Sequence, residues 1–145
     1  MKLQTLILSS VLGLMAGTAL AGASVDVYKS PYCGCCGKWV EHMRAQGFDV
    51  KTHDVEDVPG QRKKLGMPEA YGSCHTAKVD GYTVEGHVPA ADIQKLLKER
   101  PKVTGIAVPG MPMGSPGMEQ GNAKDPYDTV AFTRGGPRTV FVKHR

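Results

Sequence analysis

The spacing of apolar residues predicts a strand, a helix and a second strand in the first third of the chain. Residues 24–28, SVDVY, alternate apolar and polar side chains as a half-buried strand does. The next apolar residues recur at i, i+3, i+4 and i+7, the spacing of one helical face: Cys36, Trp39, Val40 and Met43. Gly47 suits the end of that helix, and residues 48–55 alternate again. This order predicts a βαβ unit with parallel strands.

The middle of the chain predicts a β-hairpin between two further helices. Residues 58–66, VPGQRKKLG, form a short helical turn, whose basic residues we expect on a solvated face. Residues 74–86 give two extended pieces around Asp80-Gly81, a dipeptide that favours tight turns. Residues 88–100 start a helix at Pro89 and carry three apolar residues on one face, Ile93, Leu96 and Leu97.

The last third of the chain changes character. Residues 105–128 have no apolar period and are rich in Gly, Pro and Met, which predicts a long loop without secondary structure. Two extended segments then flank Gly135-Gly136 and predict a C-terminal β-hairpin. The whole pattern predicts an α/β fold, in which a βαβ unit is followed by a β-hairpin, a helix, the loop and the last hairpin.

The N-terminus carries the features of a cleavable export signal. Lys2 precedes an apolar run over residues 6–17, and Ala19-Leu20-Ala21 has the small residues of a cleavage site. An uncleaved membrane anchor is the alternative, but the apolar run is short for a bilayer. We therefore expect residues 1–21 to be a signal peptide. Residues 22–145 then form one exported domain, most simply in a bacterial periplasm, with no membrane contact after cleavage.

Charge and motifs exclude several classes of function. Lys and Arg number 18 against 14 Asp and Glu, and the basic residues are scattered with few aromatics among them. This distribution does not favour nucleic-acid binding. The sequence also lacks a Ser-His-Asp pattern, a phosphate loop and an obvious pair of catalytic carboxylates.

The cysteines carry the strongest chemical signal. Cys33, Cys35 and Cys36 are packed between the first predicted strand and the helix, and the fourth cysteine is Cys74. Cys33 and Cys36 have C-x-x-C spacing at a helix N-terminus, the junction where thioredoxin-like proteins hold their redox pair. The amides of a helix N-terminus stabilise a thiolate, which is both the nucleophile of disulfide exchange and a metal ligand. Cys33 and Cys36 are therefore candidate redox-catalytic residues.

Structural disulfides, a zinc site and a copper cluster are the other uses that four cysteines could have. Two structural disulfides would be expected in an exported chain, but three adjacent cysteines can close at most one long loop. A structural zinc site normally takes two separated pairs of ligands, and here one crowded cluster faces a single distant cysteine. Crowded thiolates favour bridging, and soft sulfur favours Cu(I), so a polynuclear copper cluster fits the pattern better.

Methionine and histidine add further candidate ligands. Three methionines lie in the predicted loop without the period of a core face: Met111, Met113 and Met118. Thioethers bind Cu(I) and tolerate an oxidising compartment, although packing under the loop is the alternative. His75 follows Cys74 directly and is a candidate copper ligand or thiolate partner. His87 is expected near a helix start, either in a structural role or as a peripheral ligand.

Three motifs together resemble the CopG-type family of periplasmic copper-resistance proteins. They are YKSPYCGCCGKWVEHM, YGSCHTAKVDGYTVEGHVPA and IAVPGMPMGSPGME, in this order. The resemblance implies a thioredoxin-like fold, copper bound by Cys33, Cys35, Cys36 and Cys74, and an exchange between Cu(I)/Cu(II) and thiol–disulfide redox. Its partners would be copper ions, other periplasmic copper-handling proteins, or an electron donor or acceptor. A passive copper chaperone and a metal-free thiol–disulfide oxidoreductase stay open as alternatives.

Overall fold

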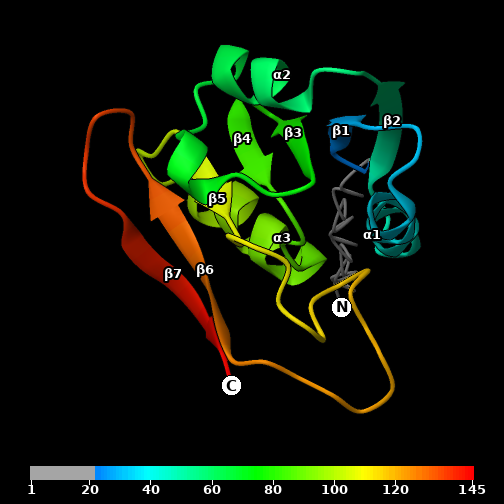
Figure 1. Ribbon diagram of the computed structural model, residues 1–145. Helices are drawn as coiled ribbons and strands as arrows, with labels where there is room; N and C mark the ends of the chain where they lie inside the picture. Colours follow the sequence, from blue (N-terminus) through cyan, green and yellow to red (C-terminus); the bar gives the residue numbers. More distant parts are fainter. Residues whose placement is uncertain (1–21) are drawn as a thin grey trace, which may run out of the picture.

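The computed structural model describes residues 22–145 as a single seven-stranded mixed sheet flanked by helices (Figure 1). The predicted signal peptide, residues 1–21, lies outside the described residues. No helix within residues 22–145 combines the length and the apolar character needed to cross a membrane.

The elements follow the predicted order, with one additional strand and a short 3₁₀ turn. In chain order they are β1 (Ser24–Lys29), α1 (Gly34–Ala45), β2 (Asp49–Asp54), α2 (Val58–Lys64), η1 (Glu69–Tyr71), β3 (His75–Val79), β4 (Tyr82–Glu85), α3 (Ala90–Glu99), β5 (Gly105–Ala107), β6 (Tyr127–Phe132) and β7 (Thr139–His144).

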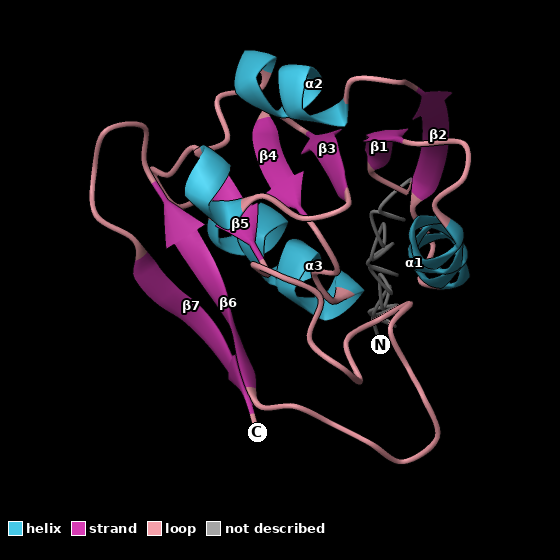
Figure 2. Cartoon of the chain, in the orientation of Figure 1, coloured by secondary structure: helices cyan, strands magenta, loops and turns pink. Residues whose placement is uncertain are grey.

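The strands lie in the order β2-β1-β3-β4-β5-β6-β7 (Figure 2). β1 and β2 are parallel, which confirms the predicted βαβ unit, and Gly47 ends its helix region with a φ of 88°. The predicted hairpins are β3–β4 and β6–β7, both antiparallel. β4 and β5 form a second parallel pair.

The sheet has an apolar cluster on each face. The larger cluster includes Trp39 and Met43 of α1 and Ile93 of α3, packed against apolar residues of the sheet. A smaller cluster contains Met67 and Phe132. Because successive strand residues point to opposite faces, neighbouring residues of β5 and β6 are divided between the two clusters. α1 packs on the sheet through the larger cluster, and its N-terminus follows the end of β1 after residues 30–33.

Two expectations about these elements were wrong. β5 falls inside the segment predicted to be a long loop, so the irregular stretch is 108–126 rather than 105–128. All three side chains of β5 are buried, and a three-residue strand is too short for an alternating pattern to be visible. Arg62 was expected on a solvated face but is buried, because it forms an ion pair with Glu85.

Candidate metal and redox centre

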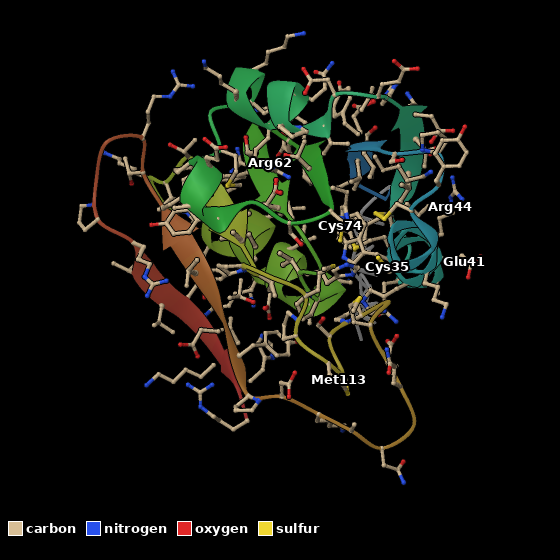
Figure 3. All side chains as sticks on the ribbon, in the orientation of Figure 1. Cys35, Glu41, Arg44, Arg62, Cys74 and Met113 are labelled. Carbon is tan, nitrogen blue, oxygen red and sulfur yellow. A yellow bond between two sulfur atoms is a disulfide. The ribbon has the colours of Figure 1, made fainter. Side chains whose placement is uncertain are left out.

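The register of the sheet brings the four cysteines together. Cys33 directly precedes α1, and Cys74 directly precedes β3. β1 and β3 are antiparallel, and Lys29 at the end of β1 pairs with His75 at the start of β3. The loop after β1 and the residue before β3 must therefore meet at the same end of the sheet. Figure 3 shows Cys35 and Cys74 facing each other there.

The four sulfur atoms lie within 4.8 Å of one another. Cys33 and Cys36 form a disulfide, while Cys35 and Cys74 are free thiols. The Cys35 Sγ lies 3.5 Å from the Cys33 Sγ and 3.8 Å from the Cys74 Sγ. The predicted convergence of Cys74 on the cluster is thus confirmed. The bridge joins residues with a sequence separation of 3, so it does not connect distant segments as a structural disulfide would.

Burial controls the protonation of Cys74. The pKa of its thiol is raised to about 11, mainly by loss of hydration; the adjacent Ser73 hydroxyl opposes this shift, and the charge of nearby Cys35 adds to it. The Ser73 Oγ lies 3.7 Å from the Cys74 Sγ. Cys74 is therefore a neutral thiol at neutral pH, and it must lose a proton before it can bind a metal ion as a thiolate.

His87, predicted from the sequence to be either structural or a peripheral ligand, is in direct contact with Cys74. Its Nε2 lies 3.1 Å from the Cys74 Sγ, and its Nδ1 lies 2.8 Å from the backbone oxygen of Pro116. A carbonyl oxygen can only accept, so Nδ1 donates and Nε2 presents its lone pair to the thiol. Burial lowers the pKa of His87, which keeps the ring neutral.

His75 lies beside this pair but makes no hydrogen bond to Cys74. It is fully buried, and neither of its ring nitrogens has a hydrogen-bond partner among residues 22–145. Burial, followed by the positive charge of His87 when protonated, lowers the pKa of His75 to about 3. Cys74, His75 and His87 each offer one ligand atom within 4.8 Å of the others. The centre therefore combines four sulfurs with two neutral imidazoles.

A buried ion pair fixes the segment that carries Cys74. The Arg62 Nε donates to the Glu85 Oε1 at 2.7 Å, and the same oxygen accepts the backbone N–H of Ser73 at 2.7 Å. The Arg62 guanidinium also donates to the Ser73 carbonyl oxygen at 2.5 Å. Both backbone groups of Ser73 are thus held, which sets the position of the following Cys74.

The loop of residues 108–126 packs on the cysteine centre. Gly117 has a φ of 89°, and a Cβ added there would lie 2.8 Å from the Cys35 carbonyl oxygen and 3.0 Å from the Trp39 nitrogen. Only glycine allows so close an approach of the loop backbone to the start of α1. The loop is also tied to the segment before β3, because the Ser73 Oγ donates to the Gly110 carbonyl oxygen at 2.7 Å.

Known proteins resemble this chain closely. The family described as "Protein of unknown function, DUF411" matches residues 71–118. The solved structure of copper resistance protein CopG, Form 2, is 48% identical, with a TM-score of 0.81 over 86% of this chain and 99% of that one. This chain belongs to the CopG family. Form 1 of the same protein is also 48% identical, with a TM-score of 0.80 over 85% of this chain and 98% of that one. No curated protein matches the sequence.

In this CopG-family chain the three loop methionines differ in position. Met118 directly follows the Gly117 contact and is partly buried. Met111 is 55% exposed and lines a cavity of about 910 Å³ between the loop and the β6–β7 hairpin. Met113 lies on the loop apart from Cys35 and Cys74 in Figure 3. A ligand role for each of these methionines stays a prediction.

Proposed function

We propose that this CopG-family protein binds copper ions as its cargo through Cys33, Cys35, Cys36 and Cys74, and so contributes to copper resistance. One observation carries the proposal, which is the convergence of the four sulfur atoms within 4.8 Å. In the fully reduced and deprotonated centre, four thiolates this close together would repel one another, and bridging Cu(I) ions would remove that repulsion. The name of the protein in the two similar structures, copper resistance protein, agrees with this cargo.

The donor chemistry of the centre supports Cu(I) over harder cations. No carboxylate belongs to either group of potential ligands found among residues 22–145, which contain four cysteines in one case and one cysteine with two histidines in the other. His75 is neutral and has no hydrogen-bond partner among these residues, so it is available as a further ligand. Met111, Met113 and Met118 would supply thioethers for copper on its way to or from the thiols.

We propose that the protein also couples copper redox to thiol–disulfide redox. Two cysteine thiolates that form one disulfide release two electrons, which reduce two Cu(II) to two Cu(I). The reverse reaction reduces the disulfide and oxidises two Cu(I). The Cys33–Cys36 disulfide and the two free thiols beside it support this chemistry, because they place both redox forms of cysteine in one centre.

The framework for this chemistry is proposed to be thioredoxin-like. The order of β1, α1, β2, β3, β4 and α3, with parallel β1–β2 and antiparallel β1–β3 and β3–β4 pairs, supports that fold. We further propose that residues 1–21 are a signal peptide and that the mature domain works in the periplasm. N-terminal sequencing of the periplasmic fraction tests this, with a start at residue 22 expected.

A metal-free thiol–disulfide oxidoreductase is the second candidate, and the Cys33–Cys36 disulfide at a helix N-terminus favours it. A passive copper carrier is the third interpretation of the same four sulfurs. The three candidates differ in what they turn over. Only the copper redox protein changes the valence of copper in proportion to thiols consumed, and only the oxidoreductase reduces disulfide substrates without metal.

The test is an anaerobic redox titration of the mature, fully reduced protein with Cu(II). The proposal predicts that each pair of thiols lost yields two Cu(I), detected with a Cu(I)-specific chromophoric chelator. It also predicts proton release on Cu(I) binding, since Cys74 is protonated at neutral pH. Copper binding without loss of thiols would support the passive carrier. Absence of copper binding, together with rapid reduction of a protein disulfide, would support the oxidoreductase.

A further inference from the structure

The position of Cys35 between the disulfide and Cys74 has a chemical consequence of its own. Its Sγ lies 3.5 Å from the Cys33 Sγ, which belongs to the disulfide, and 3.8 Å from the Cys74 Sγ. Thiol–disulfide exchange proceeds by attack of a thiolate on one sulfur of a disulfide. Cys35 therefore has an electrophilic sulfur on one side and a second nucleophile on the other.

We propose that Cys35 relays the disulfide within the protein, so that a Cys33–Cys36 bridge is exchanged for a Cys35–Cys74 bridge. In the first step the Cys35 thiolate attacks the Cys33 Sγ, which forms a Cys33–Cys35 bond, breaks the Cys33–Cys36 bond and releases the Cys36 thiolate. In the second step the Cys74 thiolate attacks the Cys35 Sγ, which forms the Cys35–Cys74 bond and releases the Cys33 thiolate.

The exchange balances without any other reactant. One disulfide and two thiols are present before and after it, and the protons of Cys35 and Cys74 are replaced through solvent by protons on Cys33 and Cys36. The Cys36 Sγ lies 3.6 Å from the Cys74 carbonyl oxygen, so the released thiol has a hydrogen-bond acceptor at once. No oxidant or reductant is consumed.

The intermediate is suited to rapid transfer. A Cys33–Cys35 bridge spans one residue, and such a small ring is strained and readily attacked. The Cys35–Cys74 product instead joins the loop after β1 to the segment before β3, which the sheet already holds side by side. Cys74 is fixed there through Ser73 and the Arg62–Glu85 pair.

The relay gives the centre two alternative pairs of free thiols. With the first bridge, Cys35 and Cys74 are free, and with the second bridge, Cys33 and Cys36 are free. If copper is the cargo, as the proposed function holds, a half-oxidised protein would offer copper one thiol pair or the other. This consequence rests on the proposed function. The exchange itself needs no metal and is tested without it.

The sequence supplies a direct readout for the exchange. Trypsin cuts after Lys29, Lys38, Lys64 and Lys78, so Cys33, Cys35 and Cys36 share the peptide 30–38, whereas Cys74 lies in the peptide 65–78. A Cys33–Cys36 bridge stays within one peptide. A Cys35–Cys74 bridge joins the two peptides, and the masses of the two products differ.

The experiment uses the mature protein, fully reduced and then given one equivalent of diamide with a chelator under anaerobic conditions. After the oxidant is removed, samples are quenched with acid over time, alkylated with N-ethylmaleimide, digested and analysed by mass spectrometry. The proposal predicts that the within-peptide and joined-peptide products redistribute to a constant ratio, with fragment ions that assign the joining bridge to Cys35. A wild-type protein whose oxidation stays within peptide 30–38 would overturn the relay.

Matched variants test the role of Cys35 itself. Cys35→Ser should lower the rate of peptide joining at least about tenfold. Without the Cys35 sulfur, Cys74 must attack the Cys33–Cys36 disulfide directly. Joining at the wild-type rate, now through Cys33 or Cys36, would contradict the relay. Cys74→Ser serves as the reference that cannot join, and circular dichroism verifies that each variant is folded. Copper titration of the wild type, run separately, shows whether the proposed copper function fails independently of the relay.

Discussion

The Cys74 thiol lies 3.1 Å from Nε2 of His87, and the opposite nitrogen of that ring lies 2.8 Å from the Pro116 carbonyl oxygen. The loop of residues 108–126 therefore selects the histidine tautomer that faces the thiol. This contact links three parts of the chain that the sequence separates widely, which are the residue before β3, the segment before α3 and the loop.

Replacing His87 with Phe should destabilise the protein, because the new ring fills the space but leaves the Pro116 carbonyl oxygen without its donor. Loss of a buried hydrogen-bond partner costs about 1–3 kcal/mol. Urea unfolding of the reduced, metal-free protein measures the change. The matched control is His53→Phe, since His53 pairs with Asp26 at a half-exposed position and should cost less than about 1 kcal/mol. Equal effects of the two substitutions would contradict the linking role of His87.

His75 predicts acid sensitivity of the fold. The pKa of His75 is lowered to about 3 in the folded protein, mainly by burial, from 6.5 in an exposed chain. Between these pH values His75 binds a proton in the unfolded chain but not in the folded protein. The free energy of unfolding therefore falls as the pH drops from 6.5 towards 3. The expected slope approaches about 1.4 kcal/mol per pH unit for this one group. Well above pH 6.5 His75 is neutral in both the folded and the unfolded chain, so it does not change the pH dependence of the free energy of unfolding.

The variant His75→Phe should lose that part of the slope. Urea unfolding of wild type and variant is compared at about pH 7.5 and about pH 4.5, where carboxylates contribute equally to both proteins. The difference in free energy of unfolding between the two proteins should then shift in favour of the variant at the lower pH. A constant difference at both pH values would show that His75 takes up its proton in the folded state.

Arg62→Met should be strongly destabilising, because it leaves Glu85 buried without its cation. Breaking one side of a buried ion pair typically costs about 3–5 kcal/mol. Burial already raises the pKa of Glu85, so the variant should also take up a proton at higher pH than the wild type. The neighbouring Lys63→Met is the control, since Lys63 is exposed and should change stability by less than about 0.5 kcal/mol. A loss as small for Arg62 as for Lys63 would refute a positioning role for the pair.

The three loop methionines can be tested together by replacing Met111, Met113 and Met118 with Leu. Leucine keeps apolar volume and removes the thioether, so stability should change by less than about 1.5 kcal/mol. If the thioethers guide copper, the triple variant should take up Cu(I) more slowly or bind it more weakly than the wild type, in stopped-flow and competition assays. Unchanged Cu(I) uptake and affinity would show that the loop methionines have a packing role and do not handle copper.

Local patterns were sufficient to predict the βαβ unit, both hairpins and the helix at residues 90–99. Each of these has either a regular apolar period or a turn signal, such as Asp80-Gly81. The meeting of Cys74 with the other cysteines was expected from the family resemblance, which implies one copper site made by all four. β5 was missed because it has three residues, all buried, and therefore no visible alternation.

The contacts of single polar side chains could not be predicted in the same way. Arg62 lies in a run of basic residues, and its partner Glu85 is on a different element, so nothing local marks it as buried. His75 was favoured over His87 because it adjoins Cys74 in sequence. Both histidines lie within 4.8 Å of the Cys74 sulfur, but it is the more distant His87 in sequence whose nitrogen is hydrogen-bonded to the thiol. The positive φ and dense packing of Gly117 likewise depend on tertiary structure.

The most direct test of a four-sulfur copper centre is anaerobic competition between Cu(I) and Zn(II) for the mature, reduced protein, followed by metal analysis. Cu(I) should displace zinc, more than one Cu(I) should bind per chain, and Cys35→Ser and Cys74→Ser should each lower the copper stoichiometry. His42→Gln is a matched control away from the sulfurs, since the His42 Nε2 accepts the backbone N–H of Ala90, and it should leave the stoichiometry unchanged. Retention of zinc in the presence of Cu(I), or full copper loading of both cysteine variants, would contradict a four-sulfur copper centre.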